Sequence, residues 1–258
     1  MRRFWERAVE RTNEQTQKRF IDVFTQYTAA VVQEASDRAD HRVRSIHDYL
    51  VLRRGTAAIA AAVAPLEFAF DIPAFVFEDA TMKNLYAWIE DILIVINVSV
   101  FDVGDLVVII DASAQLSQDM YSFNVEQARG DPHNLISAVM HDLDVNMDDA
   151  FQWAADYCNE LTTNFLTVYR NGLPSFGPEI DPQVKAYVQG LGYWARGLDA
   201  WSFESARYFG KNGEEVRVSR KVKLLPKDRR VALEGVVSGL YIMHENDGEF
   251  GVGSATEI

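Results

Sequence analysis

The chain has few of the residues that build disulfide frameworks, zinc centres or nucleic-acid surfaces. Its 258 residues include one cysteine, Cys158, and five histidines without metal-like spacing. An internal disulfide framework and a Cys/His metal site are therefore not expected. Lys and Arg number 25 against 38 Asp and Glu, a formal charge of −13. That balance disfavours binding to nucleic-acid phosphates, which need basic side chains for neutralisation.

Long apolar runs are also missing. The longest spans residues 92–101 and is followed by Asp102 and Asp105, whereas a membrane-spanning helix needs about 20 apolar residues. The opening stretch, MRRFWERAVERTNEQ, has no apolar segment typical of a secretory signal. We therefore expect a cytoplasmic protein without a membrane span, and the sequence gives no indication of its oligomeric state.

What is present fits one globular, helical domain. Hydrophobic residues make up 48% and charged residues 24%, enough for a substantial core. Apolar spacing predicts helices over about 4–38, 81–97, 119–129, 134–143, 147–170 and 181–208. Ser45 followed by Asp48 predicts a further helix start. Asp181 as the N-cap and Pro182 in the first turn predict the start of the 181–208 helix. Cys158, in the middle of a predicted helix, is expected in the core and not as a nucleophile.

Residues 119–131, DMYSFNVEQARGD, form the most informative stretch. Ser122 and Glu126 are four residues apart, so both project from one face of a helix. Hydroxyl and carboxylate oxygens are ligands that Mg²⁺ accepts. Taken alone, the same spacing is also typical of a surface helix that carries one hydroxyl and one acid.

The longer stretch 119–134, DMYSFNVEQARGDPHN, resembles the second metal-binding motif, N-D-x-x-S-x-x-x-E, of class I terpene synthases. Its continuation is similar to the sesquiterpene synthases of mushroom-forming fungi. Further segments in the family's order extend the resemblance over residues 4–227, among them FWERAVE, YLVLRRGT, LPSFGPEID and WSFESARYFGKNG. The resemblance implies an all-α fold, an incomplete class I terpenoid (isoprenoid) synthase helical barrel. It also implies Mg²⁺-dependent ionisation and cyclisation of farnesyl diphosphate with release of diphosphate.

The resemblance also implies the site residues. The metal ligands would be Asn97, Ser122 and Glu126, and the isoprenyl diphosphate substrate would be bound by Arg53, Arg129, Arg207 and Tyr208. No side chain is assigned a further catalytic role. Without the resemblance, Arg53 with Arg54 could be a surface pair. Arg207 and Tyr208 could be a solvated arginine beside a packed tyrosine.

One departure from the family pattern lies directly before the motif. The family's asparagine adjoins the aspartate, but position 118 is Gln, and the matching asparagine is Asn97. The 21 intervening residues, 98–118, are rich in β-branched side chains and predict two short strands. We interpret them as a retained intron, because Val-Ser can be encoded by GTAAGT and Gln by CAG. A genuine insertion is the alternative, and transcript sequencing across this segment distinguishes the two.

The second departure is the family's aspartate-rich motif, which precedes the segment that FWERAVE resembles and has no counterpart here. Asp148-Asp149 follows Asn146 and is typical of a helix start. We therefore expect the cyclase activity of this chain to be impaired or absent. The alternative is a non-catalytic helical protein that binds prenyl ligands or a partner. Residues 228–258 match no segment of the family and are expected to form a tail.

Aromatic side chains could line a pocket for a carbocation. The candidates are Trp88, Trp194, Trp201 and Phe203. Trp194 and Trp201 are seven residues apart and share one helix face, a spacing that is more often plain core than a ligand pocket. The sequence does not indicate which sesquiterpene would form.

Overall fold

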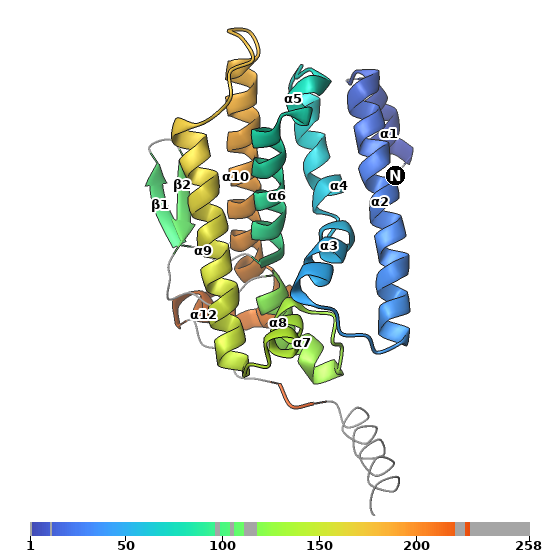
Figure 1. The fold of residues 1–258 in the computed structure, drawn as a ribbon, viewed down its shortest axis with the longest axis vertical. Coiled ribbons are helices and arrows are strands. Elements are labelled where there is room, and N and C mark those ends of the chain that lie inside the picture. Colours follow the sequence, from blue (N-terminus) through green and yellow to red (C-terminus); the bar gives the residue numbers. More distant parts are fainter. Residues whose placement is uncertain are drawn as a thin grey trace, which may run out of the picture.

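The computed structural model describes residues 2–10, 12–95, 99–103, 106–110, 118–219 and 225–227. These residues form a bundle of helices whose long members run roughly parallel or antiparallel (Figure 1). The helices, of which η1 and η2 are 3₁₀ turns, are α1 (Arg2–Val9), α2 (Glu14–Ala39), α3 (Ile46–Thr56), α4 (Ile59–Val63), η1 (Ala64–Ala69), α5 (Ala74–Glu78), α6 (Ala80–Val95), α7 (Gln118–Arg129), α8 (Leu135–Leu143), α9 (Met147–Asn171), α10 (Asp181–Glu204), α11 (Ala206–Phe209), η2 (Gly210–Asn212) and α12 (Gly213–Ser219). The expected all-α architecture is confirmed, apart from one hairpin.

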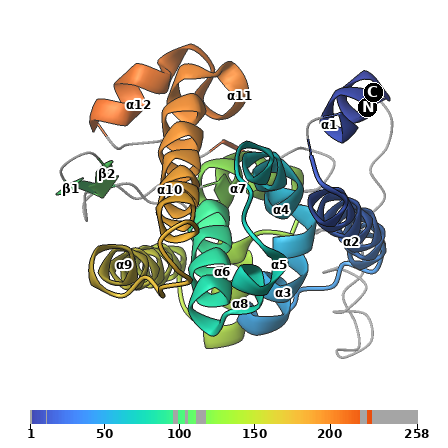
Figure 2. The same cartoon turned by 90° about the horizontal axis from the view of Figure 1, so that it is seen from above.

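That hairpin lies within the 98–118 segment. Strands β1 (Ser99–Val103) and β2 (Leu106–Ile110) are antiparallel, with Ser99 opposite Ile110 and Val103 opposite Leu106. The two strands predicted from the β-branched composition are therefore present. Strand β2 lies beside α10, outside the bundle (Figure 2).

Side-chain caps fix several helix starts. The single helix predicted over 4–38 is wrong, because the chain breaks between α1 and α2 and Asn13 accepts a hydrogen bond from the Thr16 N–H at 2.9 Å. The predicted start at Ser45 is confirmed, with its hydroxyl 3.2 Å from the Asp48 nitrogen. Asn146 likewise accepts from the Asp149 N–H at 3.0 Å. The Asp148-Asp149 pair is therefore a first-turn feature, as the sequence indicates.

Two predictions for α10 need correction. The helix ends at Glu204 and not near Tyr208, because Ser205 takes an extended conformation and its hydroxyl begins α11. Asp181 does not cap α10 from outside, since it is the first helical residue. Its carboxylate instead accepts the Phe176 N–H at 2.6 Å and the Ser175 hydroxyl at 2.7 Å, which fixes the preceding loop.

Helix α3 ends in a sharp break that positions its two arginines. Ala58 has φ +58° in the left-handed region, which separates α3 from α4. Just before the break, Gly55 packs against α2 so closely that an added Cβ would lie 2.5 Å from the Cβ of Ala30. Residues 46–69 are the one stretch of the described chain with the length and hydropathy of a membrane span. The break at Ala58 interrupts them, and they lie within the bundle.

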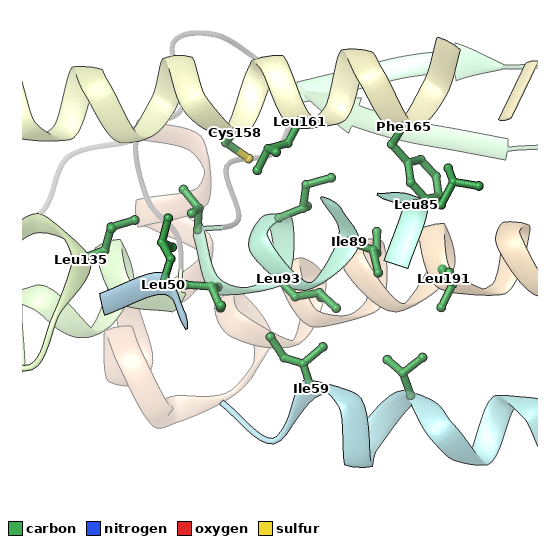
Figure 3. Packing of buried hydrophobic residues seen from close by; sticks show 14 of the residues in the cluster. Leu50, Ile59, Leu85, Ile89, Leu93, Leu135, Cys158, Leu161, Phe165 and Leu191 are labelled. Carbon is green, nitrogen blue, oxygen red and sulfur yellow. The ribbon is translucent and has the colours of Figure 1, made fainter. Parts of the chain in front are cut away.

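The core is centred on α6, which α3, α9 and α10 surround (Figure 2). Leu85, Ile89 and Leu93 are each at most 2% exposed. They face side chains of α9, α10 and α4, among them Cys158, Phe165, Leu191 and Ile59 (Figure 3). Burying each such side chain contributes roughly 1.5–3 kcal/mol. Cys158 is fully buried in this core, as predicted.

Candidate functional site

Asp119, at the start of α7, is the centre of a buried polar cluster. Its side chain accepts a hydrogen bond from the Tyr49 hydroxyl at 2.5 Å. Arg53 donates to it through Nε at 3.0 Å and Nη2 at 2.8 Å. Asp119 is 1% exposed, so Arg53 supplies the opposite charge that a buried carboxylate needs. The cluster ties α7 to α3, a contact that the sequence pattern did not indicate.

Ser122 and Glu126 lie on the same side of α7, as the four-residue spacing predicts. Asn134, which begins α8, joins them to Asp119. Its side-chain nitrogen is 2.8 Å from Glu126 Oε2, 3.5 Å from Ser122 Oγ and 2.5 Å from the Asp119 carbonyl. Its side-chain oxygen accepts the Ile136 N–H at 2.8 Å and caps α8. One fully buried amide therefore holds the polar face of α7 and starts the next helix.

Burial, reinforced by the negative charge of Asp119, raises the pKa of Glu126 to about 7. Hydrogen bonds from Asn134 and Ser122 oppose this rise. Asp119 and Glu126 thus bring two acids close to one arginine, Arg53. A cation bound beside Glu126 would relieve this excess of negative charge.

The ligand chemistry at this position fits a hard divalent cation in part. Ser122 and Glu126 offer a hydroxyl and a carboxylate, the oxygen donors that Mg²⁺ takes. The third predicted ligand, Asn97, lies outside the described residues. Among the residues that the structure describes, no group of three His, Cys, Asp or Glu side chains could hold a metal ion. The structure therefore brings together two of the three predicted metal ligands.

Arg53 is held on its other side by a second polar chain. Burial opposes its charge, but the charge and hydrogen bonds of Asp119, together with Tyr49 and Glu34, outweigh burial and raise the pKa of Arg53. Its Nη1 lies 3.5 Å from the Thr56 hydroxyl. Thr56 in turn lies beside Glu34, and His133 Nε2 is 3.2 Å from a Glu34 oxygen. Burial opposes the charge of Glu34, but Thr56, His133 and Arg38 together lower its pKa to about 2. His133 lies in the loop after α7, and its backbone N–H donates to Asp131 at 3.0 Å.

Of the remaining predicted substrate ligands, the two arginines are exposed and Tyr208 is half-buried. Arg129 is the last residue of α7 and is exposed. Arg207 is exposed on α11, and its guanidinium carbon is 5.5 Å from the centre of the Tyr208 ring. Helix α11 lies close to α7. Exposed arginines thus lie on both α7 and α11, whereas the side chain of Arg53 is 15% exposed and lies against the motif.

A second arginine cluster lies beside the first and was also missed by sequence reasoning. Arg54 donates twice to Asp91 of α6, at 2.6 and 2.7 Å, and the Tyr157 hydroxyl of α9 donates to the same carboxylate at 2.7 Å. Asp91 is 2% exposed. This cluster joins three helices of the core. An aspartate within an apolar helix face is the sequence signal that could have revealed it.

The expectation that Trp194 and Trp201 belong to the core is wrong. They are 40% and 45% exposed. Together with Leu66, Gly190, Tyr193, Gly197 and Leu198 they line an almost wholly apolar groove of about 560 Å³ on α10. An added Cβ at Gly190 would lie 2.7 Å from Leu66, so the missing side chain allows η1 to approach α10. Phe203 and Trp88 are buried and half-buried, respectively, and pack in the interior.

This fold occurs in known terpene synthases. The linalool/nerolidol synthase of Streptomyces clavuligerus superposes with a TM-score of 0.63 at 18% identity, over 77% of this chain and 61% of that protein. An α-eudesmol synthase gives 0.62 at 18% identity, over 78% and 60% of the two chains. At these identities the likeness concerns the fold alone, which is the all-α fold of class I terpenoid synthases.

The sequence comparisons are more specific. Residues 1–164 match the family described as terpene synthase family 2, C-terminal metal binding. Sesquiterpene synthase 9 of Postia placenta is 39% identical over 227 residues, 88% of this chain. A Delta(6)-protoilludene synthase of Stereum hirsutum is 39% identical over 229 residues. The chain belongs to the terpene synthase family, and it spans about 60% of the length of these relatives.

Proposed function

We propose that the chain carries the diphosphate-binding part of a sesquiterpene synthase, whose reaction is the Mg²⁺-dependent ionisation and cyclisation of farnesyl diphosphate. The observation that supports this most directly is the buried cluster in which Arg53 of α3 meets the polar face of α7. A cation-binding face beside a buried guanidinium suits a diphosphate, which needs both charges at once. The family membership and the names of the relatives agree with the proposal.

In this proposal each residue has a binding role. Arg53, Arg129 and Arg207 donate hydrogen bonds to diphosphate oxygens, since a guanidinium can bind two of them at once. Tyr208 packs against Arg207 and adds a hydroxyl donor. Asn97, Ser122 and Glu126 hold Mg²⁺, which supplies Lewis-acid stabilisation of the negative charge on the leaving diphosphate.

We further propose that this activity is impaired in the chain as it stands. In the sequence, residues 98–118 separate Asn97 from Asp119, and α7 begins at Gln118, so the motif asparagine is not four residues before Ser122 on this helix. Position 118, four residues before Ser122, holds a glutamine. Arg53 is also bound to Asp119 through two nitrogens, and a diphosphate has to displace that carboxylate.

A deletion tests both halves of this proposal. Removing residues 98–118 joins Asn97 to Asp119 and restores the motif spacing. Isothermal titration should show that inorganic diphosphate with Mg²⁺ binds the deletion variant about tenfold more tightly than the unaltered chain, since a third ligand completes the site. Ser122→Ala with Glu126→Gln should abolish this gain. Equal binding by both chains contradicts the proposed ligand set.

Activity is measured separately, by incubating the unaltered chain with farnesyl diphosphate and Mg²⁺ and analysing the volatile products. Little or no cyclic product is expected. A clear cyclic product would overturn the proposed impairment but would support the cyclase assignment.

The exposed groove on α10 favours a second candidate, a non-catalytic protein that binds prenyl ligands. Its lining is apolar and includes Trp194 and Trp201, which suits a hydrocarbon chain and not a phosphate. Quenching of tryptophan fluorescence by farnesol, without Mg²⁺, tests this candidate. If Trp194→Ala removes the binding and Arg53→Gln does not, the groove is the ligand site.

A further inference from the structure

A cavity of about 290 Å³ lies between α2, η1, α6 and α10. We call it the Glu90 cavity, after the acid of α6 that lines it. None of its lining residues belongs to the cluster around Asp119, and neither the motif nor the proposed function uses them.

The walls of the Glu90 cavity carry an excess of acidic groups. Asp22, Glu67 and Glu90 come from three different elements. Arg19 neutralises Glu67, at 2.7 Å. The other lining cation, Lys83, pairs with Glu78 at 2.6 Å and is exposed.

Glu90 is left without a cation of its own in the described part of the chain. Arg54 is near enough to lower its pKa, but that guanidinium is already bonded twice to Asp91. Burial prevails and raises the pKa of Glu90 to about 7. The charged and titratable groups that face it are Arg54, Asp91, Arg19, Asp22, Glu67, Lys83, Tyr86 and Tyr187.

Aromatic rings also line the Glu90 cavity. The ring of Phe77 lies under the Arg19 guanidinium at 4.4 Å, so this face already accepts a cation. Tyr187 meets Phe77 edge-on, with centroids 5.5 Å apart. Tyr187 is 1% exposed, and its hydroxyl has no hydrogen-bond partner within the described residues. An unpartnered buried hydroxyl is costly unless a ligand or water completes it.

We propose that the Glu90 cavity binds a small organic ammonium ion. The ammonium group donates to Glu90 and to the free lone pairs of the Tyr187 hydroxyl, and the apolar body lies against Tyr86. A carboxylate without its own cation, a hydroxyl without a partner and the ring of Tyr86 together select positive charge. The volume limits the ligand to a small one, at the lower end of the range for binding pockets.

Three probes of matched size test the proposal: benzylammonium, benzyl alcohol and benzoate. Each is titrated into the unaltered chain at pH 8 without Mg²⁺ or diphosphate, and binding is followed by calorimetry and by ligand-observed NMR. Benzylammonium should bind at least about tenfold more tightly than the neutral or the anionic probe. Equal affinity for the three probes, or no binding of benzylammonium, overturns the proposal.

Variants locate the ammonium group. Glu90→Gln keeps the shape of the side chain and should weaken benzylammonium binding about tenfold, whereas Tyr187→Phe, which removes only a hydroxyl, should weaken it about threefold. Glu214→Gln is the matched control, because Glu214 is a fully exposed acid on α12 and should have no effect. If both cavity variants bind benzylammonium as the unaltered chain does, the proposed site is wrong. The proposed diphosphate site is unaffected by that result, because none of these experiments depends on Arg53.

Discussion

Arg53 and Arg54 are neighbours on α3, and the structure uses them in different ways. Both hold a buried carboxylate through two nitrogens, Asp119 and Asp91 respectively. Asp91 belongs to the central helix and also receives Tyr157, so its pair joins three packed helices. Asp119 belongs to α7, next to the groups that are predicted to bind metal and substrate. The same type of ion pair therefore joins core helices in one case and lies at the proposed ligand site in the other.

Removing Asp91 should have the largest effect. Asp91→Ala leaves the Tyr157 hydroxyl without its acceptor and Arg54 without its buried counter-charge, which should lower the free energy of unfolding by about 2–4 kcal/mol. Urea denaturation followed by circular dichroism measures the change. Asp148→Ala, at an exposed first-turn position of α9, is the control and should change stability by less than about 0.5 kcal/mol. A small effect of Asp91→Ala would remove the distinction between the two pairs.

Asp119→Asn should weaken the fold less and strengthen ligand binding. The amide keeps the shape but loses the charge-assisted bonds, at a cost of about 1–3 kcal/mol. Arg53 is then released, so inorganic diphosphate should bind about threefold to tenfold more tightly, because less of the protein is in the self-bonded state. The measurement is calorimetric titration with diphosphate. The matching change Asp91→Asn should give no gain, and a gain there would show that the effect is not specific to Arg53.

Glu90, the neighbour of Asp91, should make the stability of the protein depend on pH. Its pKa is raised from 4.5 to about 7, so the folded state binds a proton more tightly than the unfolded state. This contribution to stability is present below about pH 4.5 and is lost as the pH rises through about 7. Glu90→Gln should therefore stabilise the protein at pH 8 by about 1–2 kcal/mol and have little effect at pH 5. A variant whose stability relative to the unaltered chain is the same at both pH values would contradict the raised pKa.

Gly55→Ala should have the smallest effect and acts on both arginines. The added methyl group would lie 2.5 Å from the Cβ of Ala30, so α3 has to move away from α2. The overpacking cost of about 1–3 kcal/mol is partly offset by the better helix propensity of alanine, worth about 1 kcal/mol. Thermal unfolding measures the net change. An unchanged or higher melting temperature would show that α2 and α3 adjust without strain.

The sequence predicted the helices well because capping residues and apolar spacing are local signals. Ser45 and Asn146 cap helices as predicted, and the β-branched 98–118 segment contains the two strands. The errors have a local cause too. Asn13 was overlooked as a cap, so α1 and α2 were merged, and Ser205 was overlooked at the end of α10.

The site was predicted only in part, because its contacts join distant parts of the chain. The spacing of Ser122 and Glu126 is a property of one helix and could be predicted from the sequence. The bonds of Asp119 to Tyr49 and Arg53 cross 66 residues or more, and no periodicity predicts such a pairing. The exposure of Trp194 and Trp201 is likewise set by which helices surround α10. The predicted roles of Asn97, Arg129, Arg207 and Tyr208 remain predictions.

The amide of Asn134 has a consequence for how ligand occupancy could be observed. Its nitrogen bonds Glu126 while its oxygen caps the first turn of α8, so an ion that binds Glu126 through Oε2 displaces this amide. Displacement removes the acceptor of the Ile136 N–H, at the first turn of α8. Faster hydrogen–deuterium exchange at the Ile136 amide would then report that the cation is bound, without any measurement of activity.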